Sequence, residues 1–527
     1  MFCNSVFYIR RGFILLKMFQ FAAIINPYYF ISYHHAFLAY KEGSIMNYTE
    51  LIVFIVYFLF MVGIGLFFFF RSKDSGEKDY FLGGRQMGAW VSALSAGASD
   101  MSAWVLMGLP ASIYAAGMGQ TWIAIGLGLG YAASWIFEAP RLRRFSIAAN
   151  DSITIPQYLT NRFLSKSKLL QVLCAVIFLV AYTIYAASSI KACGTLFNTV
   201  MNIDANVAMY IAAFIIIAYT FLGGFSAVCW TDFFQGLLML AALLIAPIFA
   251  LALVNTGDLG ATAALPDGYF RFWTSWQDVI SGLGWGLGYF GMPHIIVRFM
   301  SLKSERELRK SSVIGISWTV IILVMSVLSG VVGRLFLGDI ADSSTVFITM
   351  TRKIFPALIS GLLLSAILSA AMSTADSQLL ASASAFANDV YKPVFRKNAS
   401  NKEMLWAGRI VVIVIAIIAL IIAANPNSGT IMALVENAWG VFGAAFGPAI
   451  MLSLFWKRFT FSGAVAGIAV GAVVDILWLA LLSSTGIYEI IPGFIASLVA
   501  AIVVSLCSPK PSAEVEKLFD TASKPEA

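Results

Sequence analysis

One aspartate lies in the middle of an apolar stretch, where an ionised carboxylate is costly and usually serves a function. Asp100 is preceded by Ser95-Ala96-Gly97-Ala98-Ser99 and followed by Met101 and Ser102, so small and hydroxylated residues surround a single acid. Such a segment unwinds readily, and unwinding frees backbone carbonyls that, with hydroxyls and a carboxylate, suit a hard cation such as sodium. The pattern predicts an ion path here. The alternative is close packing of two helices through small residues.

A second segment carries glycine at almost every other position and a proline. Residues 282–294 read Gly-Leu-Gly-Trp-Gly-Leu-Gly-Tyr-Phe-Gly-Met-Pro-His. Trp285, Tyr289 and Pro293 recur every fourth residue, so any helical part places them on one face, where aromatic rings would cover a small ligand. An aromatic stripe at this spacing is also typical of ordinary packing, and we interpret His294 as a packing residue.

Polar residues in other apolar stretches give weaker signals. Ser373 and Thr374 offer two adjacent hydroxyls to a cation, or bond back to the carbonyls of their own helix. Asp232 lies at the expected start of a span, where it either caps the helix or takes part in ion access. Three further acids near the ends of spans are predicted to be interfacial: Glu138, Glu436 and Asp475.

The composition places all these segments in a membrane. The 527 residues are 60% hydrophobic and 12% charged, whereas soluble domains average roughly 45 to 50% apolar and about 25% charged. This excludes a disordered chain and a set of soluble enzyme domains. Five scattered cysteines without a CxxC pair, and only three histidines, argue against redox chemistry and structural zinc. The net charge of +7 comes from separate short clusters, which argues against a nucleic-acid partner.

Apolar stretches of about 20 residues, the length that crosses a bilayer as a helix, recur about thirteen times. The expected spans are 51–70, 88–110, 120–140, 168–190, 205–223, 231–254, 276–297, 311–335, 357–385, 405–424, 429–455, 461–483 and 488–507. The two interrupted segments fall in the second and seventh spans, five apart. This is the spacing of two inverted five-helix repeats whose discontinuous helices hold a substrate near the midplane. The sequence therefore predicts an all-α polytopic transporter.

The basic residues predict the orientation of the chain. Of the 34 Lys and Arg residues, 25 lie in alternate connections and in the C-terminal tail, and five lie on the opposite side. By the positive-inside rule the tail is expected in the cytoplasm. An odd number of spans then places the residue-46 end outside the cell.

Residues 1–45 form a doubtful extension. Their apolar part, 13–32, carries Lys17 and Pro27, and no small-residue cleavage site follows. Lys41-Glu42-Gly43 before Met46 is what a purine-rich ribosome-binding sequence would encode, so our hypothesis is an over-extended start; the alternative is a real extra helix. The expected organisation is this extension, a transmembrane transporter domain at 46–507 and a cytoplasmic tail at 508–527. A peptide from 1–45 detected by mass spectrometry of the native protein would contradict the hypothesis.

Eight motifs together resemble one known family. They are Gly83-Gly84-Arg85, residues 95–104, Met107-Gly108-Leu109-Pro110, Trp230-Thr231-Asp232, residues 284–299, residues 364–368, Met372-Ser373-Thr374 and residues 443–448. From Met46 to about Leu506 the chain resembles the sodium:solute symporter family, most closely its bacterial members that carry proline.

The resemblance implies a LeuT-type core from the second to the eleventh span, with one extra helix before it and two after. It also implies sodium-coupled import of L-proline across the plasma (bacterial inner) membrane by alternating access, driven by the sodium gradient. Sodium, L-proline and the lipid bilayer are the expected partners, with no obligate protein partner and no cofactor beyond the coupling ion. The alternative is another small carboxylate or a vitamin on the same scaffold. The sequence has no HExxH, nucleophile elbow or paired histidines, so no enzymatic activity is expected.

The resemblance further assigns roles to individual residues. The sodium site is expected at Ala98, Met101, Ala370, Ser373 and Thr374. Coupling of sodium to substrate is expected at Asp100, Ser102, Arg85 and Asp232. The substrate is expected at Trp285, Tyr289, Pro293 and Tyr185. One departure is Ala103, where the family pattern usually has glycine, so the backbone is expected to bend less freely there.

Overall fold

The computed structural model describes residues 47–71, 77–222, 224–255 and 265–525. Within these ranges the regular structure is helical, apart from one isolated bridge between Met87 and Leu302. The extension at 1–45 and the question of its start lie outside the described residues.

The described chain forms helices almost throughout, with η marking 3-10 and π segments. In chain order they are α3 Tyr48–Arg71, α4 Glu77–Leu82, η1 Gly83–Arg85, α5 Ala89–Met101, α6 Trp104–Ala116, η2 Met118–Gln120, α7 Thr121–Ala133, η3 Ser134–Glu138, α8 Ala139–Ala148, α9 Ile155–Arg162, α10 Leu169–Met201, α11 Ala205–Leu222, α12 Phe225–Asn255, α13 Trp276–Gly284, η4 Trp285–Phe290, α14 Pro293–Ser301, α15 Glu305–Leu337, η5 Ser343–Thr345, α16 Val346–Ile354, α17 Ala357–Ser384, η6 Ala385–Phe395, α18 Asn401–Ala424, η7 Pro426–Ser428, α19 Ile431–Phe455, α20 Phe461–Leu482, η8 Ser483–Thr485, α21 Ile490–Cys507 and α22 Ala513–Ser523.

Ten helical segments of the described ranges are long and apolar enough to cross a membrane. A helix satisfies its own backbone hydrogen bonds, which is required where no water is present. Large apolar side chains such as Phe214, Val313 and Leu481 are about 70% exposed on the outer helices. The hydrocarbon of a bilayer is the solvent that such a surface suits, so the chain is a multi-pass membrane protein.

The chain is interrupted at both segments that the sequence singled out. α5 ends at Met101, and α6 begins only at Trp104. α13 ends at Gly284 and passes into the 3-10 turn η4, after which α14 begins at Pro293. Both interruptions lie inside the protein, where neighbouring helices can satisfy the freed backbone groups.

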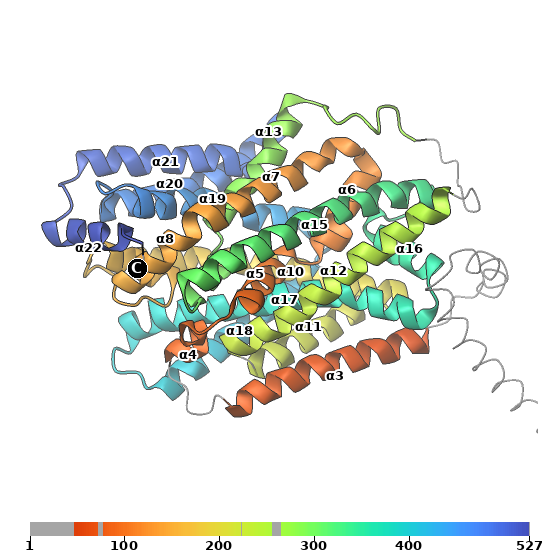
Figure 1. The fold of residues 1–527 in the computed structure, drawn as a ribbon, viewed down its shortest axis with the longest axis horizontal. Helices are drawn as coiled ribbons and strands as arrows, with labels where there is room; N and C mark the ends of the chain where they lie inside the picture. The colour runs from red at the N-terminus through yellow and green to blue at the C-terminus, as the bar shows by residue number, and fades with distance from the viewer. Residues whose placement is uncertain (1–46, 72–76, 223, 256–264, 526–527) are drawn as a thin grey trace, which may run out of the picture.

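α5 is the central element of the bundle. All of its residues except Trp90 are buried, and it packs against α12, α14, α15 and α17. Figure 1 shows α5 in the middle of the molecule, with α3 along one long edge and α20 and α21 along the opposite edge. The small residues of α5 allow this close approach, so the acid-centred segment lies at the core and away from lipid.

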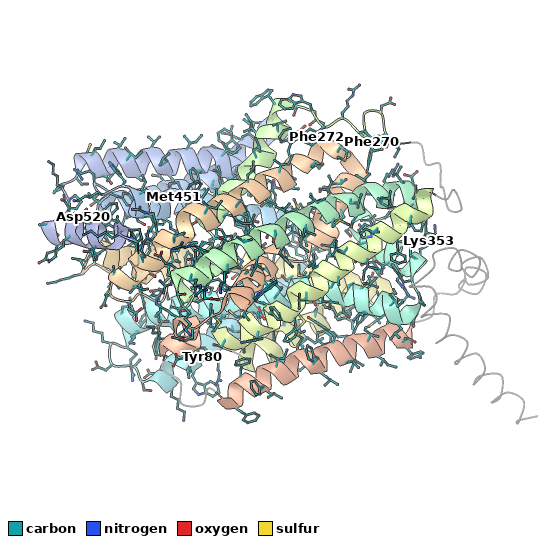
Figure 2. All side chains as sticks on the ribbon, in the orientation of Figure 1. Tyr80, Phe270, Phe272, Lys353, Met451 and Asp520 are labelled. Carbon is teal, nitrogen blue, oxygen red and sulfur yellow. The ribbon has the colours of Figure 1, made fainter. Side chains whose placement is uncertain are left out.

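The described chain has two ends along its long axis. Figure 2 places Asp520 at one end and Lys353 toward the other. The tail adds structure at the first end, because α22 docks on α8 and α9. The tail expected at 508–527 therefore contains a packed helix.

Three expectations are corrected by the helix boundaries and by burial. α12 begins at Phe225, so Asp232 is its eighth residue and does not cap it. Glu138 is fully buried and accepts a hydrogen bond of 2.8 Å from the Ser134 hydroxyl. The helix does not end near residue 140 as expected, because the π turn η3 leads directly into α8. Asp475 is likewise buried, well before the end of α20. The prediction that these two acids are interfacial is wrong.

Candidate functional site

The break between α5 and α6 is made by one serine. Ser102 has φ 33° and ψ 177°, whereas Ala103 has a helical conformation with φ −63° and ψ −16°. A side chain at position 103 therefore does not restrict the bend, contrary to the expectation drawn from the family pattern. The last carbonyls of a helix lack intrahelical partners, so the end of α5 presents free acceptors.

Asp100, in the last turn of α5, is contacted from two other elements. The Tyr289 hydroxyl of η4 donates a hydrogen bond of 2.6 Å to its Oδ2. The Tyr185 hydroxyl of α10 donates to its backbone carbonyl at 3.4 Å. Asp100 Oδ1 and the Ser102 hydroxyl are buried and have no hydrogen-bond partner among the described residues. The structure thus brings Asp100, which is expected to couple sodium to substrate, into contact with Tyr289 and Tyr185, which are expected to bind the substrate.

The residues expected to bind sodium lie where α5 meets α17. The Ser373 hydroxyl donates to the Ala98 carbonyl at 2.8 Å and to the Ala370 carbonyl at 3.2 Å. Thr374 Oγ1 is fully buried, and no described group bonds to it. Met101 lies three residues beyond Ala98, at the break itself. Hydroxyls and backbone carbonyls are hard oxygen donors, so this set fits a hard cation.

Asp232 belongs to a buried network around Arg298. Its Oδ2 accepts from the Ser95 hydroxyl at 2.7 Å and from Arg298 Nη2 at 3.2 Å. Arg298 Nη2 also donates to the Ser377 hydroxyl at 2.6 Å. The network connects α5, α12, α14 and α17, and its ion pair is almost completely shielded from solvent. Because a buried charge is stable only when paired, Asp232 and Arg298 depend on each other.

Arg85 fixes a second, peripheral network. Its guanidinium donates to Asp151 at 2.9 Å, to the Ser146 hydroxyl at 3.1 Å, and to the carbonyls of Ser152 at 2.8 Å and Met300 at 2.6 Å. These contacts tie the turn before α5 to the α8–α9 connection and to the end of α14. Lys78 adds a second cation to Asp151. Arg85 therefore holds three segments together at the α22 end of the molecule.

Trp285 and Tyr289 belong to an aromatic group, but Pro293 does not share their helix. Trp285 lies with its ring centroid 6.2 Å from that of Trp104, and Trp439 Nε1 donates to the Trp285 carbonyl at 2.8 Å. The Trp439 ring lies 5.0 Å from that of Tyr289. Pro293 is the first residue of α14, beyond the break, where it lines a cavity of about 40 Å³ on the side of Arg298. The regular four-residue face predicted for all three is interrupted after Tyr289.

His294 is buried, as expected of a packing residue. Its ring faces the Ser99 carbonyl at 3.2 Å, and its backbone N–H donates to the Tyr182 hydroxyl at 2.9 Å. It therefore ties α14 to α5 and α10 close to Asp100.

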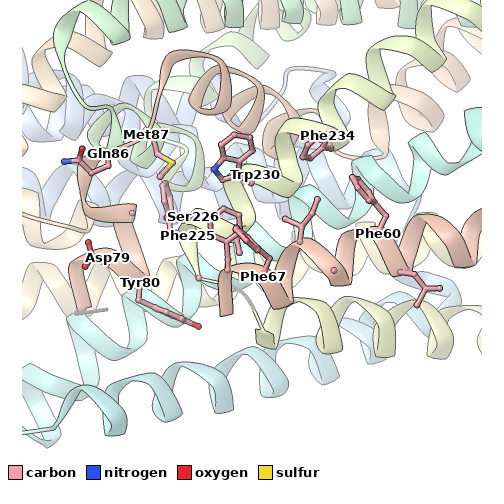
Figure 3. Close-up of a pocket in the computed structure, with 17 residues that line it drawn as sticks. Phe60, Phe67, Asp79, Tyr80, Gln86, Met87, Phe225, Ser226, Trp230 and Phe234 are labelled. Atoms are coloured by element: carbon pink, nitrogen blue, oxygen red, sulfur yellow. The ribbon is translucent and has the colours of Figure 1, made fainter. Parts of the chain in front are cut away.

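A larger cavity lies apart from the predicted site residues. It has a volume of about 1090 Å³ and runs between α3 and α12, lined by aromatic residues such as Phe60, Phe67 and Trp230 (Figure 3). Phe60 and Phe67 are both exposed, so the cavity opens toward lipid. None of the predicted site residues lines it.

Sequence reasoning missed several residues of these networks. In the sequence Arg298 looks like one of the basic residues of a connection between spans. Its position four residues after His294, on the same helix face, is the signal that could have placed it inside the protein. Asp151 and Trp439 are brought in by tertiary contacts from distant parts of the chain. No spacing signal in the sequence connects them with Arg85 or Trp285.

Comparison with known proteins identifies the family. The sequence pattern of the sodium:solute symporter family matches residues 80–471. The chain belongs to the sodium:solute symporter family. It is 44% identical over 463 residues to the high-affinity proline transporter PutP of Bacillus subtilis strain 168, covering 86% of this chain and 97% of that protein. It is 42% identical over 487 residues to a sodium/proline symporter of Staphylococcus aureus strain JH9, covering 89% and 95%.

Solved structures support the same fold for this symporter. A sodium-coupled sialic acid symporter in an outward-open, substrate-bound state superposes with a TM-score of 0.73 at 21% identity, covering 89% of this chain and 99% of the other. The nucleobase-cation symporter Mhp1 in a closed conformation gives 0.53 at 15% identity, covering 84% and 97%. At these identities the likeness concerns the fold, which is that of LeuT-like transporters.

Proposed function

We propose that this family member is a sodium-coupled symporter that imports L-proline by alternating access. The observation that carries the proposal is the contact at the α5 break, where Ser373 bonds to Ala98 next to Asp100 and Tyr289. An ion held there orders the end of α5 against α17 and so shapes the substrate site beside it. The proline relatives at 42 to 44% identity supply the substrate.

The proposed architecture has thirteen transmembrane helices. The ten long helices are completed by α11 and by the two interrupted segments, α5 with α6 and α13 with α14. Two inverted five-helix repeats then run from α5 to α19, with α3 before them and α20 and α21 after. The transporter domain is proposed to extend over 46–507, after the 1–45 extension. We propose that it lies in the plasma membrane, which is the inner membrane of a bacterium. α22 and the tail are then in the cytoplasm, and the residue-46 end is outside the cell.

The proposed ion site is formed by the carbonyls of Ala98, Met101 and Ala370 and the hydroxyls of Ser373 and Thr374. The buried, unpartnered Thr374 Oγ1 supports this assignment, since such a group needs a partner. Sodium is a co-substrate that leaves with each cycle, and no further cofactor is proposed.

The proposed substrate site lies between Asp100, Tyr289, Tyr185 and Trp285. The Asp100 carboxylate suits the secondary ammonium of proline, and the aromatic rings suit its apolar ring. Ser102 and Asp232 are proposed to couple sodium to substrate, Arg85 to hold the cytoplasmic side closed, and Pro293 to position the start of α14 beside the pocket.

Inward movement of sodium drives the cycle. Each charge that crosses about 100 mV of membrane potential gains roughly 2.3 kcal/mol, before the concentration gradient adds its share. Rocking of one group of helices against the rest would expose the site to each side in turn. The alternative is that the same machinery carries another small carboxylate or a vitamin.

The test is uptake of labelled L-proline into proteoliposomes with an inward sodium gradient and an inside-negative potential. Accumulation with sodium, none with potassium alone, and its loss in Asp100→Ala would support the proposal. Sodium-driven uptake of a different carboxylate, with no uptake of proline, would replace the substrate and keep the mechanism. No sodium-driven uptake of any carboxylate by folded protein would overturn the proposal.

A further inference from the structure

Three acids outside the predicted sodium site face one point on α19. Asp475 of α20 and Glu489, the residue before α21, are buried, with 1% and 6% of their surfaces exposed, and Glu436 of α19 is partly buried. A Cβ built on Gly440 would lie 3.0 Å from Asp475 Oδ1 and 3.3 Å from Glu489 Cγ. Glu436 precedes Gly440 by four residues and shares its helix face. The two buried side chains therefore meet over the bare backbone of Gly440.

Three of the four oxygens of the two buried carboxyl groups lack a partner among the described residues. Neither oxygen of Asp475 has a hydrogen-bond partner in the described ranges, and Glu489 Oε1 also lacks one. No ion pair within those ranges reaches any of the three acids. A buried carboxyl group meets this cost by pairing with a positive charge or strong donors, or by binding a proton. The side chain of Asp475, more than nine-tenths buried and next to Gly440, is therefore available to pair with a cation.

The acids are connected to the substrate region through their neighbours in the sequence. The ring of Tyr488, the neighbour of Glu489, lies 5.1 Å from the ring of Trp285, and its hydroxyl donates to the Glu436 carbonyl at 2.8 Å. Trp439, the neighbour of Gly440, donates to the Trp285 carbonyl. A charge bound over Gly440 would thus lie next to the aromatic residues that cover the interrupted segment η4.

We propose that Asp475 and Glu489, with Glu436 nearby on α19, bind a monovalent cation over Gly440, at a site separate from the one between α5 and α17. Oxygen donors without thiol or imidazole favour a hard cation or an ammonium group. No three acids, histidines or cysteines among the described residues form a group able to hold a metal ion, so the proposed site rests on two carboxylates and suits a single positive charge. The ligand is either sodium or the ammonium group of the amino acid as it enters.

Two variants test the site in different ways. Asp475→Asn with Glu489→Gln removes two charges at nearly constant shape. Gly440→Ala keeps all three acids and places a methyl group between them, on a helix that tolerates alanine. Asp204→Asn, at an exposed acid that caps α11, is the matched control because asparagine also caps helices.

The measurements are binding of radioactive sodium to the purified full chain in a Ser373→Ala background and sodium-driven proline uptake in the wild-type background. If sodium is the ligand, both site variants weaken the remaining sodium binding by about tenfold or more, and the control does not. If the ammonium is the ligand, sodium binding is unchanged, and the proline concentration for half-maximal uptake at saturating sodium rises instead.

Wild-type sodium binding and wild-type proline dependence in Gly440→Ala would overturn the inference and would mean that the acids carry protons. Should the double variant fail to give monodisperse protein, Gly440→Ala still decides the question. Only the uptake measurement rests on the proposed function. Failure of the wild-type chain to transport proline would therefore refute that function, while the binding measurement still tests the cation site.

Discussion

The hydroxyl of Ser373 on α17 donates a hydrogen bond of 2.8 Å to the backbone carbonyl of Ala98, the residue two positions before Asp100 on α5. α5 ends three residues after Ala98, so the bond fixes the last turn of an interrupted helix against a continuous one. An ion that takes the place of this hydroxyl proton would draw the same two helices together. Ion binding and the position of the Asp100 side chain are therefore linked through one turn of backbone.

We expect Ser373→Ala to raise the sodium concentration for half-maximal uptake by about tenfold, because one ion ligand is lost. The proline concentration for half-maximal uptake at saturating sodium should change little. Ser365→Ala is the matched control, since the Ser365 hydroxyl is equally buried but bonds only to Gly361 within its own helix. Equal effects of the two substitutions on sodium dependence would contradict the assignment.

We expect Tyr289→Phe to raise the proline concentration for half-maximal uptake by about tenfold. The lost hydroxyl bonds to Asp100 at 2.6 Å, and hydrogen bonds to charged groups contribute about 1.5 to 3 kcal/mol. Sodium binding without proline should remain near the wild-type value. Tyr158→Phe removes an equally buried hydroxyl that bonds to Ser453 instead, and it should leave uptake unchanged. If both phenylalanine variants behave alike in uptake kinetics, Tyr289 has no role in substrate binding.

We expect Asp151→Asn to weaken the closure that Arg85 makes at the α22 end. Partial burial raises the pKa of Asp151, but the hydrogen bonds from Lys78 and Arg85 outweigh it, so its pKa lies below the usual value. The contact is therefore complete at neutral pH and is lost only as the pH falls through that lowered value. Even an ordinary Asp is ionised between about pH 6 and 8, and Asp151 is ionised at lower pH still. Sodium-driven uptake should therefore change little over this range on account of Asp151.

In Asp151→Asn the charge is absent at every pH, and proline should leak from loaded proteoliposomes without sodium faster than from wild type. Asp339→Asn, an exposed acid paired with Arg334 far from Arg85, is the control. Wild-type leak in Asp151→Asn would show that this contact does not keep the transporter closed.

We expect Phe519→Ala to release α22 from the bundle. The Phe519 ring packs 5.3 Å from that of Phe145 and 5.0 Å from the Arg162 guanidinium, and its side chain is mostly buried. Truncation of such a ring costs about 3 kcal/mol, which should lower the melting temperature in detergent by a few degrees. Limited proteolysis after residue 508 should become faster. Lys517→Ala, at an exposed position of the same helix, should leave both measurements as in wild type.

Much of the fold could be predicted because a bilayer imposes simple rules. Long apolar runs predict helices, and the serine- and glycine-rich runs around Asp100 and residues 282–294 predict where helices break. The sequence could not place Arg298 with Asp232, since their pairing arises when α14 crosses α12. The prediction for Asp475 is wrong because this residue lies well before the end of α20, on a face that α19 and α21 cover.

The site could be predicted in part for a related reason. Ala370 is predicted from the family pattern alone, and Ser373 also from the adjacent hydroxyl of Thr374. Partners from other elements, such as Trp439 against Trp285 and Asp151 against Arg85, depend on how helices pack. The glycines of the 282–294 run predict a bend and nothing more. The structure adds a packing reason, because a Cβ on Gly288 would collide with the indole of Trp439.

Glycines of the same run also pack backbone to backbone against glycines of α7. A Cβ on Gly130 of α7 would collide with the backbone of Gly286 in η4, and one on Gly126 with that of Gly282 in α13. Because this packing leaves no room between the two backbones, we expect α7 and the interrupted segment to move as one body in the proposed transport cycle. A disulfide engineered between them should leave turnover intact, whereas one between α5 and α17 should arrest it. We therefore expect the boundary between the moving groups of helices to lie beside Ser373, between α5 and α17, and not between α7 and the interrupted segment that carries Trp285 and Tyr289.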